Sequence, residues 1–524
     1  MLYERFFMGI TSFYFLCFFA LVLIAYYTVP LLFKKRGQWV VLLFASIIFY
    51  LFSVNGNYVQ IVFPLAASFT TWGLLKLLAC TEEKELLKRR LILAAELVVL
   101  LGILIVFKFY TFITGGGITP PTGLSFYTFI LLGYFIEVYN GIGVRRDSLL
   151  ETTLIGMFFP LVVQGPIIKT REHSGQLFEY HKADFKNLTF GAQRMLWGFF
   201  KMLVISQRLR TIVDEIYAVD AEYTGAYIWL GTVCFAFELY TNFSGGIDIV
   251  IGLSEMLGII LPENFTTPFF AKNISEYWRR WHATLGIWMK DNVFYPLLRT
   301  KMIMGLGKTL KKVFGKKKGK QLTTYVAMFI LWFSVGLWHG GEATFVIGSG
   351  LLHWAYIVLG EVTLPFFTWI FEKKMHINLQ SKFANGFRVV RTFFFVCIGD
   401  LFFRSKSIPH ALGLLKRSVS AFNPQIFVDG SLLNLGLSIY EWGVLLVSLA
   451  VLITVSTIQY RMELSRDGKI TGSRFEGYSN LREYIASKKL VIRWIVYFAL
   501  FFTVLLLAEY GPGFNPADSI YDDF

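Results

Sequence analysis

The sequence predicts an all-α polytopic membrane protein of about ten to twelve transmembrane helices, with re-entrant and interfacial helices between them. Hydrophobic residues make up 55% of the 524 residues, and the mean hydropathy of +0.56 is too high for a water-soluble globule of this length. Many apolar stretches are long enough to span a bilayer. The basic residues gather in short segments between these stretches, as is typical of loops at a membrane surface.

The predicted spans follow one another along the whole chain. The first, residues 11–29, is too long for the apolar core of a signal peptide and has no small-residue cleavage site before Pro30. No linker or internal repeat divides the chain, so we predict a single integral membrane domain over residues 1–524. The other stretches of spanning length are residues 39–54, 58–79, 91–113, 123–141, 224–240, 321–338, 343–361, 387–403, 441–457 and 491–508.

The distribution of basic residues predicts the orientation of the chain. The formal net charge of +15 comes from loops rather than from a basic folded domain, so we predict contact with membrane lipid and not with nucleic acid. Basic segments at residues 34–36, 84–90 and 145–146 alternate with connections that carry no charge. This pattern places the basic segments in the cytosol and the N-terminus outside. Residues 299–320, with nine basic and no acidic residues, predict a further cytosolic loop.

Residues 154–168 predict a re-entrant hairpin rather than a full crossing. The apolar run is short, and Pro160 and the Gly165-Pro166 pair interrupt it. A broken backbone at membrane depth is tolerated only where protein covers its polar groups. Hairpins of this kind often contribute to functional sites.

The four cysteines give no indication of a metal centre. Cys17, Cys80, Cys234 and Cys397 each stand alone in apolar sequence, without the paired spacing typical of zinc or dithiol sites. We therefore interpret them as small core or lipid-facing residues and predict no bound metal.

Residues 333–345, FSVGLWHGGEATF, place His339 at the end of a long apolar stretch. The helix predicted from Thr323 to His339 rises about 24 Å, so the imidazole lies inside the membrane or near its outer interface. An ionisable group at that depth indicates a functional site by default, because burial is tolerated only beside a polar partner or cavity. Gly336 and Gly340 have the small-xxx-small spacing that lets two helices approach closely. The alternative is a histidine that hydrogen-bonds one carbonyl across a helix interface.

Residues 272–298, KNISEYWRRWHATLGIWMKDNVFYPLL, predict one amphipathic helix that is too polar to span the membrane. Asn273 followed by Glu276 is typical of an N-cap, and Glu276 and Arg280 form a favourable pair four residues apart. His282 falls at the seam between the polar and apolar faces, where it either faces a cavity or is solvated. The apolar face consists of Ile274, Trp278, Trp281, Leu285 and Trp288.

Several segments between about residues 105 and 420 resemble the membrane-bound O-acyltransferase (MBOAT) family. The likeness is greatest to its alginate-acetylating branch and smaller to the branch that transfers D-alanine to teichoic acid. Where the alginate branch has DFSGYSD, this chain has NFSGGID, so one acidic position is neutral and Asp248 remains. The segments that carry the resemblance are NFSGGIDIVIGLSEMLGIILPENFTTPFFAKNISEYWRRWHATLGIWMKDNVFYPLL, VGLWHGGEATFVIGSGLLHW, PTGLSFYTFILLGYFIEVYNG, FFPLVVQGPIIKTREHSGQL and CIGDLFFRSKSIPHALGLLK.

This resemblance implies a multi-helix membrane fold with an active site inside the bilayer, reachable from both faces. His339 matches the near-invariant histidine of the family and His282 matches its second histidine, so we predict both as catalytic residues. We place the catalytic core at residues 231–360, including the basic cytosolic loop 299–320. The predicted substrate-binding residues are Asn242, Ser244, Asp248, Asn273, Trp278, Arg279, Arg280 and Trp281.

These residue types suit acyl transfer from a thioester to a hydroxyl. The reaction requires a base that takes the hydroxyl proton, and burial keeps the His339 imidazole in the neutral form that serves this purpose. It also requires donors for the oxyanion, for which His282, Asn273, Trp278 and Arg279 are candidates. A direct transfer and an acyl-histidine intermediate both remain open.

The resemblance implies that the protein carries no bound cofactor and works with substrates on both faces of a bacterial plasma (inner) membrane. The donor is predicted to be acetyl-CoA or an acyl carrier thioester, whose negative charges suit the basic cytosolic segments. The acceptor is predicted to be an extracytoplasmic polysaccharide, reached directly or through a separate hydrolase-like acetyltransferase partner. His353 also matches a common histidine of the family, and we interpret it as a packing residue or one that supports the active-site side chains.

Two alternatives to polysaccharide O-acetylation remain. One is D-alanyl transfer to teichoic acid from a carrier protein, and the motif RRWH and the segment LPENF favour the acetylating branch over it. The other is a membrane transporter, which would also contain polar residues and broken helices within the membrane. A transporter of this kind usually has an internal repeat, and the sequence shows none.

Overall fold

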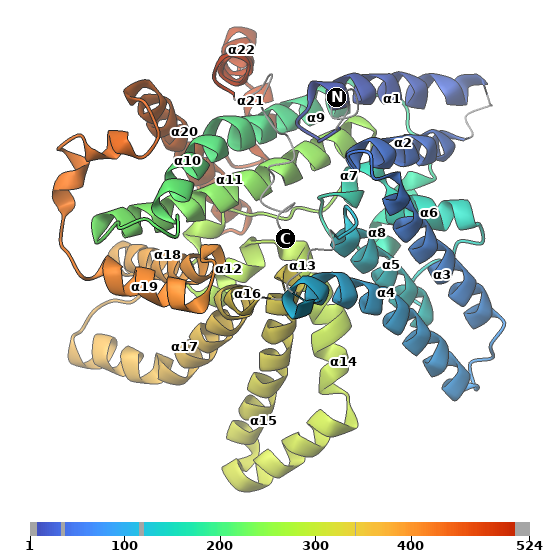
Figure 1. Ribbon diagram of the computed structural model, residues 1–524, viewed down its shortest axis with the longest axis horizontal. Helices are drawn as coiled ribbons and strands as arrows, with labels where there is room; N and C mark the ends of the chain where they lie inside the picture. The colour runs from blue at the N-terminus through green and yellow to red at the C-terminus, as the bar shows by residue number, and fades with distance from the viewer. Residues whose placement is uncertain (1–7, 33–36, 115–119, 341, 509–524) are drawn as a thin grey trace. The chain divides into compact units, whose positions relative to one another are not determined.

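The computed structural model describes residues 8–32, 37–114, 120–340 and 342–508, with only the backbone for 111–114. Within these ranges the chain folds into helices joined by short connections, and no strand occurs (Figure 1). The predicted all-α class is therefore confirmed. The basic segment 34–36, on which the predicted orientation partly depends, lies outside the described residues.

Seven helices of the described chain are long and apolar enough to cross a membrane, which is consistent with a multi-pass membrane protein. The predicted total of about ten to twelve spans stays a prediction. Four predicted spans lie in helices that are not among the seven, namely α2 (Gln38–Ser53), α5 (Leu124–Tyr139), α11 (Ala226–Met256) and α18 (Lys382–Arg404). The seven are α1 (Phe13–Leu32), Tyr58–Ala79 with α3 (Val62–Ala79), Leu86–Tyr110 of α4 (Leu86–Thr114), α15 (Lys301–His339), Ala343–Lys374 with α16 (Ala343–Phe345) and α17 (Leu352–Thr368), α20 (Ile439–Arg466) and α22 (Leu490–Leu507).

The chain divides into two compact units. Among the described residues, the first unit lies within 8–200 and 243–263, and the second lies within 201–242 and 264–508. The boundary crosses α11, so this helix belongs to both units. This division concerns the packing of the backbone, and the single membrane domain stays a prediction.

The first unit encloses the segment that was predicted to be re-entrant. In residues 154–168 one helix ends at Met157 and a short turn of helix follows at Phe159–Val162, with Pro160 in its first turn. The backbone N–H of Phe159 donates to the hydroxyl of Ser46 at 3.0 Å, so a protein group satisfies this N–H at the break, while the re-entrant course through the membrane stays a prediction. The helices of this unit, besides α1, α3 and α4, are α2 (Gln38–Ser53), α5 (Leu124–Tyr139), α6 (Leu149–Met157), α7 (Phe159–Val162), α8 (Thr170–His173) and α9 (Phe185–Phe199).

The second unit contains α15, which packs closely against the π-helical segment Val346–Leu351. A Cβ atom placed on Gly336 would lie 2.7 Å from the Val346 Cα atom, and one on Gly350 would lie 2.6 Å from the Trp332 carbonyl oxygen. Glycine is therefore required at both positions, and the predicted close helix approach at Gly336 is confirmed. The other helices of this unit are α10 (Gln207–Ile216), α12 (Ile274–Arg280), α13 (Ala283–Met289), α14 (Tyr295–Leu298), α19 (Ile408–Ser418) and α21 (Leu481–Ala486).

The basic stretch 299–320 was predicted to be a loop, and this prediction is wrong. α15 begins at Lys301, where the Thr300 hydroxyl caps it by accepting from the Ile303 backbone N–H. Lysine is a good helix former, so a run of lysines is compatible with an exposed helix. The helix is interrupted at Gly315, which has φ +80°.

The single amphipathic helix predicted over 272–298 is also wrong, because the structure breaks it into α12, α13 and α14. The predicted N-cap is confirmed, since the Asn273 side chain accepts from the Glu276 backbone N–H at 2.8 Å. The predicted apolar face is confirmed as well, since its side chains are buried or half-buried on both sides of the break.

Candidate active site

His339 is the last residue of α15 and is 6% exposed. Its imidazole packs edge-on against two aromatic rings, with ring centroids 4.8 Å from Trp338 and 5.6 Å from Phe403. The C-terminal end of a helix carries partial negative charge, which favours the imidazolium that forms when a histidine takes up a proton. The position therefore suits a proton acceptor that is shielded from water.

His282 lies in the connection between α12 and α13 and has a left-handed backbone, with φ +44°. Asn264 holds this connection. Its backbone carbonyl accepts from the Ala283 N–H at 3.0 Å, and its side-chain oxygen accepts from the Thr284 N–H at 3.2 Å. The free N–H groups at the start of α13 are thus satisfied from a distant part of the sequence. This capping by Asn264 is the physical reason why the predicted single helix breaks here.

The contacts of Asn264 also determine the tautomer of His282. A backbone N–H can only donate, so the Asn264 atom that faces Thr284 is the carbonyl oxygen. The same oxygen lies 3.1 Å from His282 Nδ1, which must therefore carry the proton. Burial lowers the pKa of His282 to about 3, so the ring is neutral at pH 7 and Nε2 keeps its lone pair. His282 is thus an acceptor or base through Nε2 and lacks the second N–H that an oxyanion donor needs.

Trp338 brings the two predicted catalytic histidines together. The centroid of its ring system lies 5.8 Å from the His282 ring and 4.8 Å from the His339 ring. Both imidazoles therefore contact one indole, although α13 and α14 separate them along the chain.

The other predicted aromatic residues lie in the same unit. Trp278 packs against His353 with ring centroids 4.9 Å apart, and against Trp332 at 5.0 Å. Trp281 stacks on Tyr277 at 5.6 Å. His353 is 3% exposed and surrounded by these rings, as expected for a packing residue.

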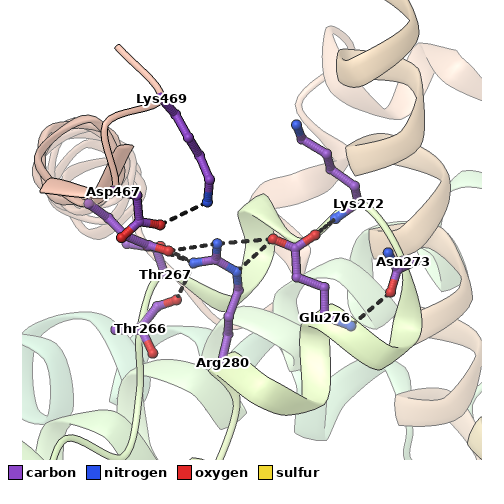
Figure 2. Close-up of polar contacts among 9 residues, drawn as sticks. Thr266, Thr267, Lys272, Asn273, Glu276, Arg280, Asp467 and Lys469 are labelled. Carbon is purple, nitrogen blue, oxygen red and sulfur yellow. Dashed lines mark hydrogen bonds and ion pairs between the residues drawn. The ribbon is translucent and has the colours of Figure 1, made fainter. Parts of the chain in front are cut away.

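Arg280, predicted to bind substrate, forms a buried ion-pair network (Figure 2). Its guanidinium donates to Glu276 at 3.0 Å and to Glu463 of α20 at 2.7 Å, and it also donates to the Thr266 carbonyl at 3.0 Å. The predicted Glu276–Arg280 pair is therefore confirmed. These contacts fasten α12 to α20 and give Arg280 a structural role, while substrate contact by this residue stays a prediction.

Asp248, also predicted to bind substrate, forms an ion pair within the first unit. Its carboxylate accepts from Arg194 Nε at 2.9 Å, and the same guanidinium makes two hydrogen bonds to Glu263. Asp248 thus joins α11 to α9. Asn242 and Ser244 lie on α11 as well, and each is 2% exposed.

Asn273 and Arg279 lie at the surface of α12. The Asn273 side chain caps the helix and is exposed, and Arg279 is exposed while its neighbour Arg280 is buried. The structure leaves the roles of these predicted residues in binding untested.

Three residues that shape the site were not among those predicted. Asn264 orients His282, Trp338 contacts both histidines, and Phe403 covers His339. Asn264 lies in the segment LPENF, and Trp338 directly precedes His339. Both residues therefore lie in or next to features that the sequence analysis had identified. Phe403 comes from α18 and has no local signal that connects it to His339.

The chain is similar to known proteins over the region that contains these motifs. Residues 144–399 match the model of the membrane-bound O-acyltransferase family, and this region contains both histidines and the predicted core 231–360. The chain is 30% identical over 302 residues to a protein of Pseudomonas syringae pv. tomato named probable alginate O-acetylase AlgI. It is 29% identical over 391 residues to the protein of the same name from Pseudomonas aeruginosa. It is 27% identical over 292 residues to the teichoic acid D-alanyltransferase of Bacillus subtilis.

These alignments cover only part of each relative. They include 58% of this chain and 52% of the P. syringae protein, 71% and 68% for P. aeruginosa, and 55% and 69% for B. subtilis. The chain therefore spans about half the length of the first of these relatives.

Proposed function

Because this chain belongs to the membrane-bound O-acyltransferase family, we propose that it is a membrane O-acyltransferase that moves acetyl groups onto an extracellular or cell-wall polysaccharide. The observation that carries the proposal is the pair of buried imidazoles, His282 and His339, in contact with one indole. One of them is held in the tautomer that leaves Nε2 able to accept a proton. A neutral, water-shielded base of this kind suits the activation of a hydroxyl.

His339 is the base in the proposed reaction. It removes the proton of the acceptor hydroxyl, the resulting alkoxide attacks the thioester carbonyl, and the carbon–sulfur bond breaks. The imidazolium then returns the proton to the departing thiolate, so the transfer releases no net proton. His282 accepts a hydrogen bond through Nε2 and orients the hydroxyl. An acyl-histidine intermediate is an alternative route with the same overall balance.

The donor in this proposal is acetyl-CoA or an acyl carrier thioester, used as a substrate rather than held as a cofactor. The exposed lysines of α15 between residues 301 and 320 suit the negative charge of either donor. The acceptor polysaccharide lies outside in this proposal, and the acetyl group reaches it directly or through a separate hydrolase-like acetyltransferase. The protein would lie in the bacterial plasma membrane with its N-terminus outside, as the basic segments indicate.

A second candidate function is D-alanyl transfer to teichoic acid. The observation in its favour is the similarity to the B. subtilis teichoic acid D-alanyltransferase, 69% of which the alignment covers. The acetyl proposal is favoured by the longer alignment with the P. aeruginosa alginate O-acetylase.

The test compares the wild type with His339→Gln in purified, nanodisc-embedded protein. We expect the wild type to release CoA from acetyl-CoA when a polysaccharide acceptor is present, and the variant to lose at least 100-fold in rate with an unchanged thermal midpoint. Ester-linked acetyl in the cell envelope and secreted polysaccharide should fall in parallel, as measured by mass spectrometry. Loss of esterified D-alanine instead would support the second candidate. A protein that moves solute but consumes no thioester would be a transporter.

A further inference from the structure

α11 carries a carboxyl group whose burial the proposed reaction does not explain. Glu238 is 3% exposed, and among the described residues its Oε2 atom has no hydrogen-bond partner. Burying a carboxyl without a partner costs several kcal/mol in rough terms, so native proteins keep such groups mainly where they have a function. Its backbone carbonyl accepts from the Thr241 hydroxyl at 3.3 Å and from the Ser206 hydroxyl at 3.5 Å.

A second buried oxygen lies one helical turn further along α11. Asn242 is 2% exposed, and its Oδ1 atom likewise lacks a hydrogen-bond partner in the described part of the chain. Residues four apart on a helix have neighbouring side chains on the same face. Glu238 and Asn242 therefore present two buried polar groups side by side.

This face of α11 is turned toward the aromatic ring that covers His339. Phe235 precedes Glu238 by three residues and shares its face. The Phe235 ring lies 6.3 Å from the Phe403 ring in a stacked arrangement, and Phe403 lies 5.6 Å from the His339 ring. A single aromatic side chain thus separates the helix face of Glu238 from the proposed catalytic base.

The surrounding charges do not provide Glu238 with an ion pair. The charged groups whose fields act on it are Arg404, Asp214 and Arg210. Both arginines are engaged by Asp214, with Arg404 donating to Oδ1 and Arg210 lying 3.5 Å from Oδ2. The charged groups near Glu238 are therefore paired with one another, and Glu238 keeps an oxygen available for a ligand.

We propose that Glu238 and Asn242 bind two hydroxyl groups of a polyhydroxylated acceptor and so position it beside His339. This inference rests on the proposed acyltransferase function. The amide oxygen of Asn242 accepts hydrogen bonds, and a carboxyl buried without an ion pair is protonated and can both donate and accept, so the pair suits a ligand that carries donors and acceptors together, whereas an acetyl thioester donates none. A sugar or polyol carries several O–H donors at neighbouring positions, and it can serve both oxygens together. Glu238 and Asn242 are thus positioning residues that select a polyol over a simple alcohol.

The test measures steady-state acetyl transfer by the full-length protein in nanodiscs, with acetyl-CoA as donor. The acceptor probes are glycerol, methyl β-D-glucoside and 1-propanol. We expect the wild type to prefer the two polyols over 1-propanol by kcat/KM. Glu238→Met should raise the KM for the polyols about tenfold and leave the KM for acetyl-CoA unchanged, as expected for one lost hydrogen bond to a charged or buried group. Glu238→Gln keeps one acceptor oxygen and should retain part of the preference.

Thr241→Val is the matched control, because this buried hydroxyl on the same helix donates only to helix carbonyls, those of Phe237 at 2.7 Å and Glu238 at 3.3 Å, and leaves the Glu238 side chain in place. This control should change neither the KM for the polyols nor the KM for acetyl-CoA. The inference is overturned if Glu238→Met leaves the polyol preference intact, if it raises the KM for acetyl-CoA equally, or if the wild type cleaves acetyl-CoA without preferring any polyol. A loss that occurs only with an aminoacyl donor would assign Glu238 to an ammonium group instead. Failure of the wild type to consume any thioester would count against the proposed function itself.

Discussion

The Asn264 side chain acts on the candidate active site through its amide oxygen. This oxygen accepts hydrogen bonds from the Thr284 backbone N–H at the start of α13 and from His282 Nδ1–H. We predict that Asn264→Leu lowers kcat by about 10- to 100-fold, because His282 loses the partner that sets its tautomer. The variant should also lose about 1–3 kcal/mol of stability through the lost cap and hydrogen bond. Ser438→Ala is the control, since it removes the exposed cap of α20 and should lower stability alone. An unchanged kcat in Asn264→Leu would contradict this role.

The burial of His282 predicts how stability depends on pH. Its pKa falls from 6.5 to about 3 on folding, so between these values the unfolded chain binds more protons than the folded one. Stability contributed by the neutral ring is therefore complete above pH 6.5 and decreases as the pH falls below it. We predict that His282→Gln makes the unfolding midpoint in detergent less sensitive to pH between 6.5 and 4. Equal slopes for variant and wild type would show that His282 does not titrate on unfolding.

At the scale of the elements, the contact between α15 and the segment Val346–Leu351 positions His339. Gly336→Ala would place a methyl group 2.7 Å from the Val346 Cα atom, and backbone atoms have little room to move. We predict a loss of about 1–3 kcal/mol and a lower kcat, measured by thermal unfolding and acetyl transfer. Gly305→Ala in the same helix is the control, because nothing lies within 4 Å of its added Cβ atom. That control should be neutral or stabilising.

Variants at the ion pair between α12 and α20 can distinguish a structural role of Arg280 from a role in substrate binding. Arg280→Met leaves the carboxylates of Glu276 and Glu463 without their common partner, whereas Glu463→Gln leaves Arg280 paired with Glu276. We therefore predict that Arg280→Met lowers the thermal midpoint more, by an amount equivalent to about 3–5 kcal/mol. A raised donor KM with no loss of stability in Arg280→Met would instead assign the guanidinium to substrate binding.

At the scale of the whole molecule, the basic segments predict which face of the membrane each end of α15 meets. We predict that Lys312→Cys, in a background with all four cysteines replaced by serine, reacts with a membrane-impermeant thiol reagent only after the cells are permeabilised. The exposed side chain of residue 312 makes it accessible to the reagent. Labelling in intact cells would reverse the orientation proposed for the chain.

Local features of the sequence predicted much of the fold, because they act over a few residues. Composition and the length of apolar stretches determined the all-α membrane class. The Asn273 cap and the Glu276–Arg280 pair followed from spacings of three and four residues. The predicted end of the helix at His339 agrees with the last residue of α15.

Tertiary structure alone decided the features that depend on residues far apart in the chain. The break at His282 needs Asn264, the second partner of Arg280 comes from α20, and the Phe403 ring over His339 comes from α18. None of these contacts has a signal within one helical turn, because hydrogen bonds and packing across helices depend on where the backbone carries each partner. The sequence by itself determined which helices form and which histidines merit attention, while long-range contacts decided how those histidines are held.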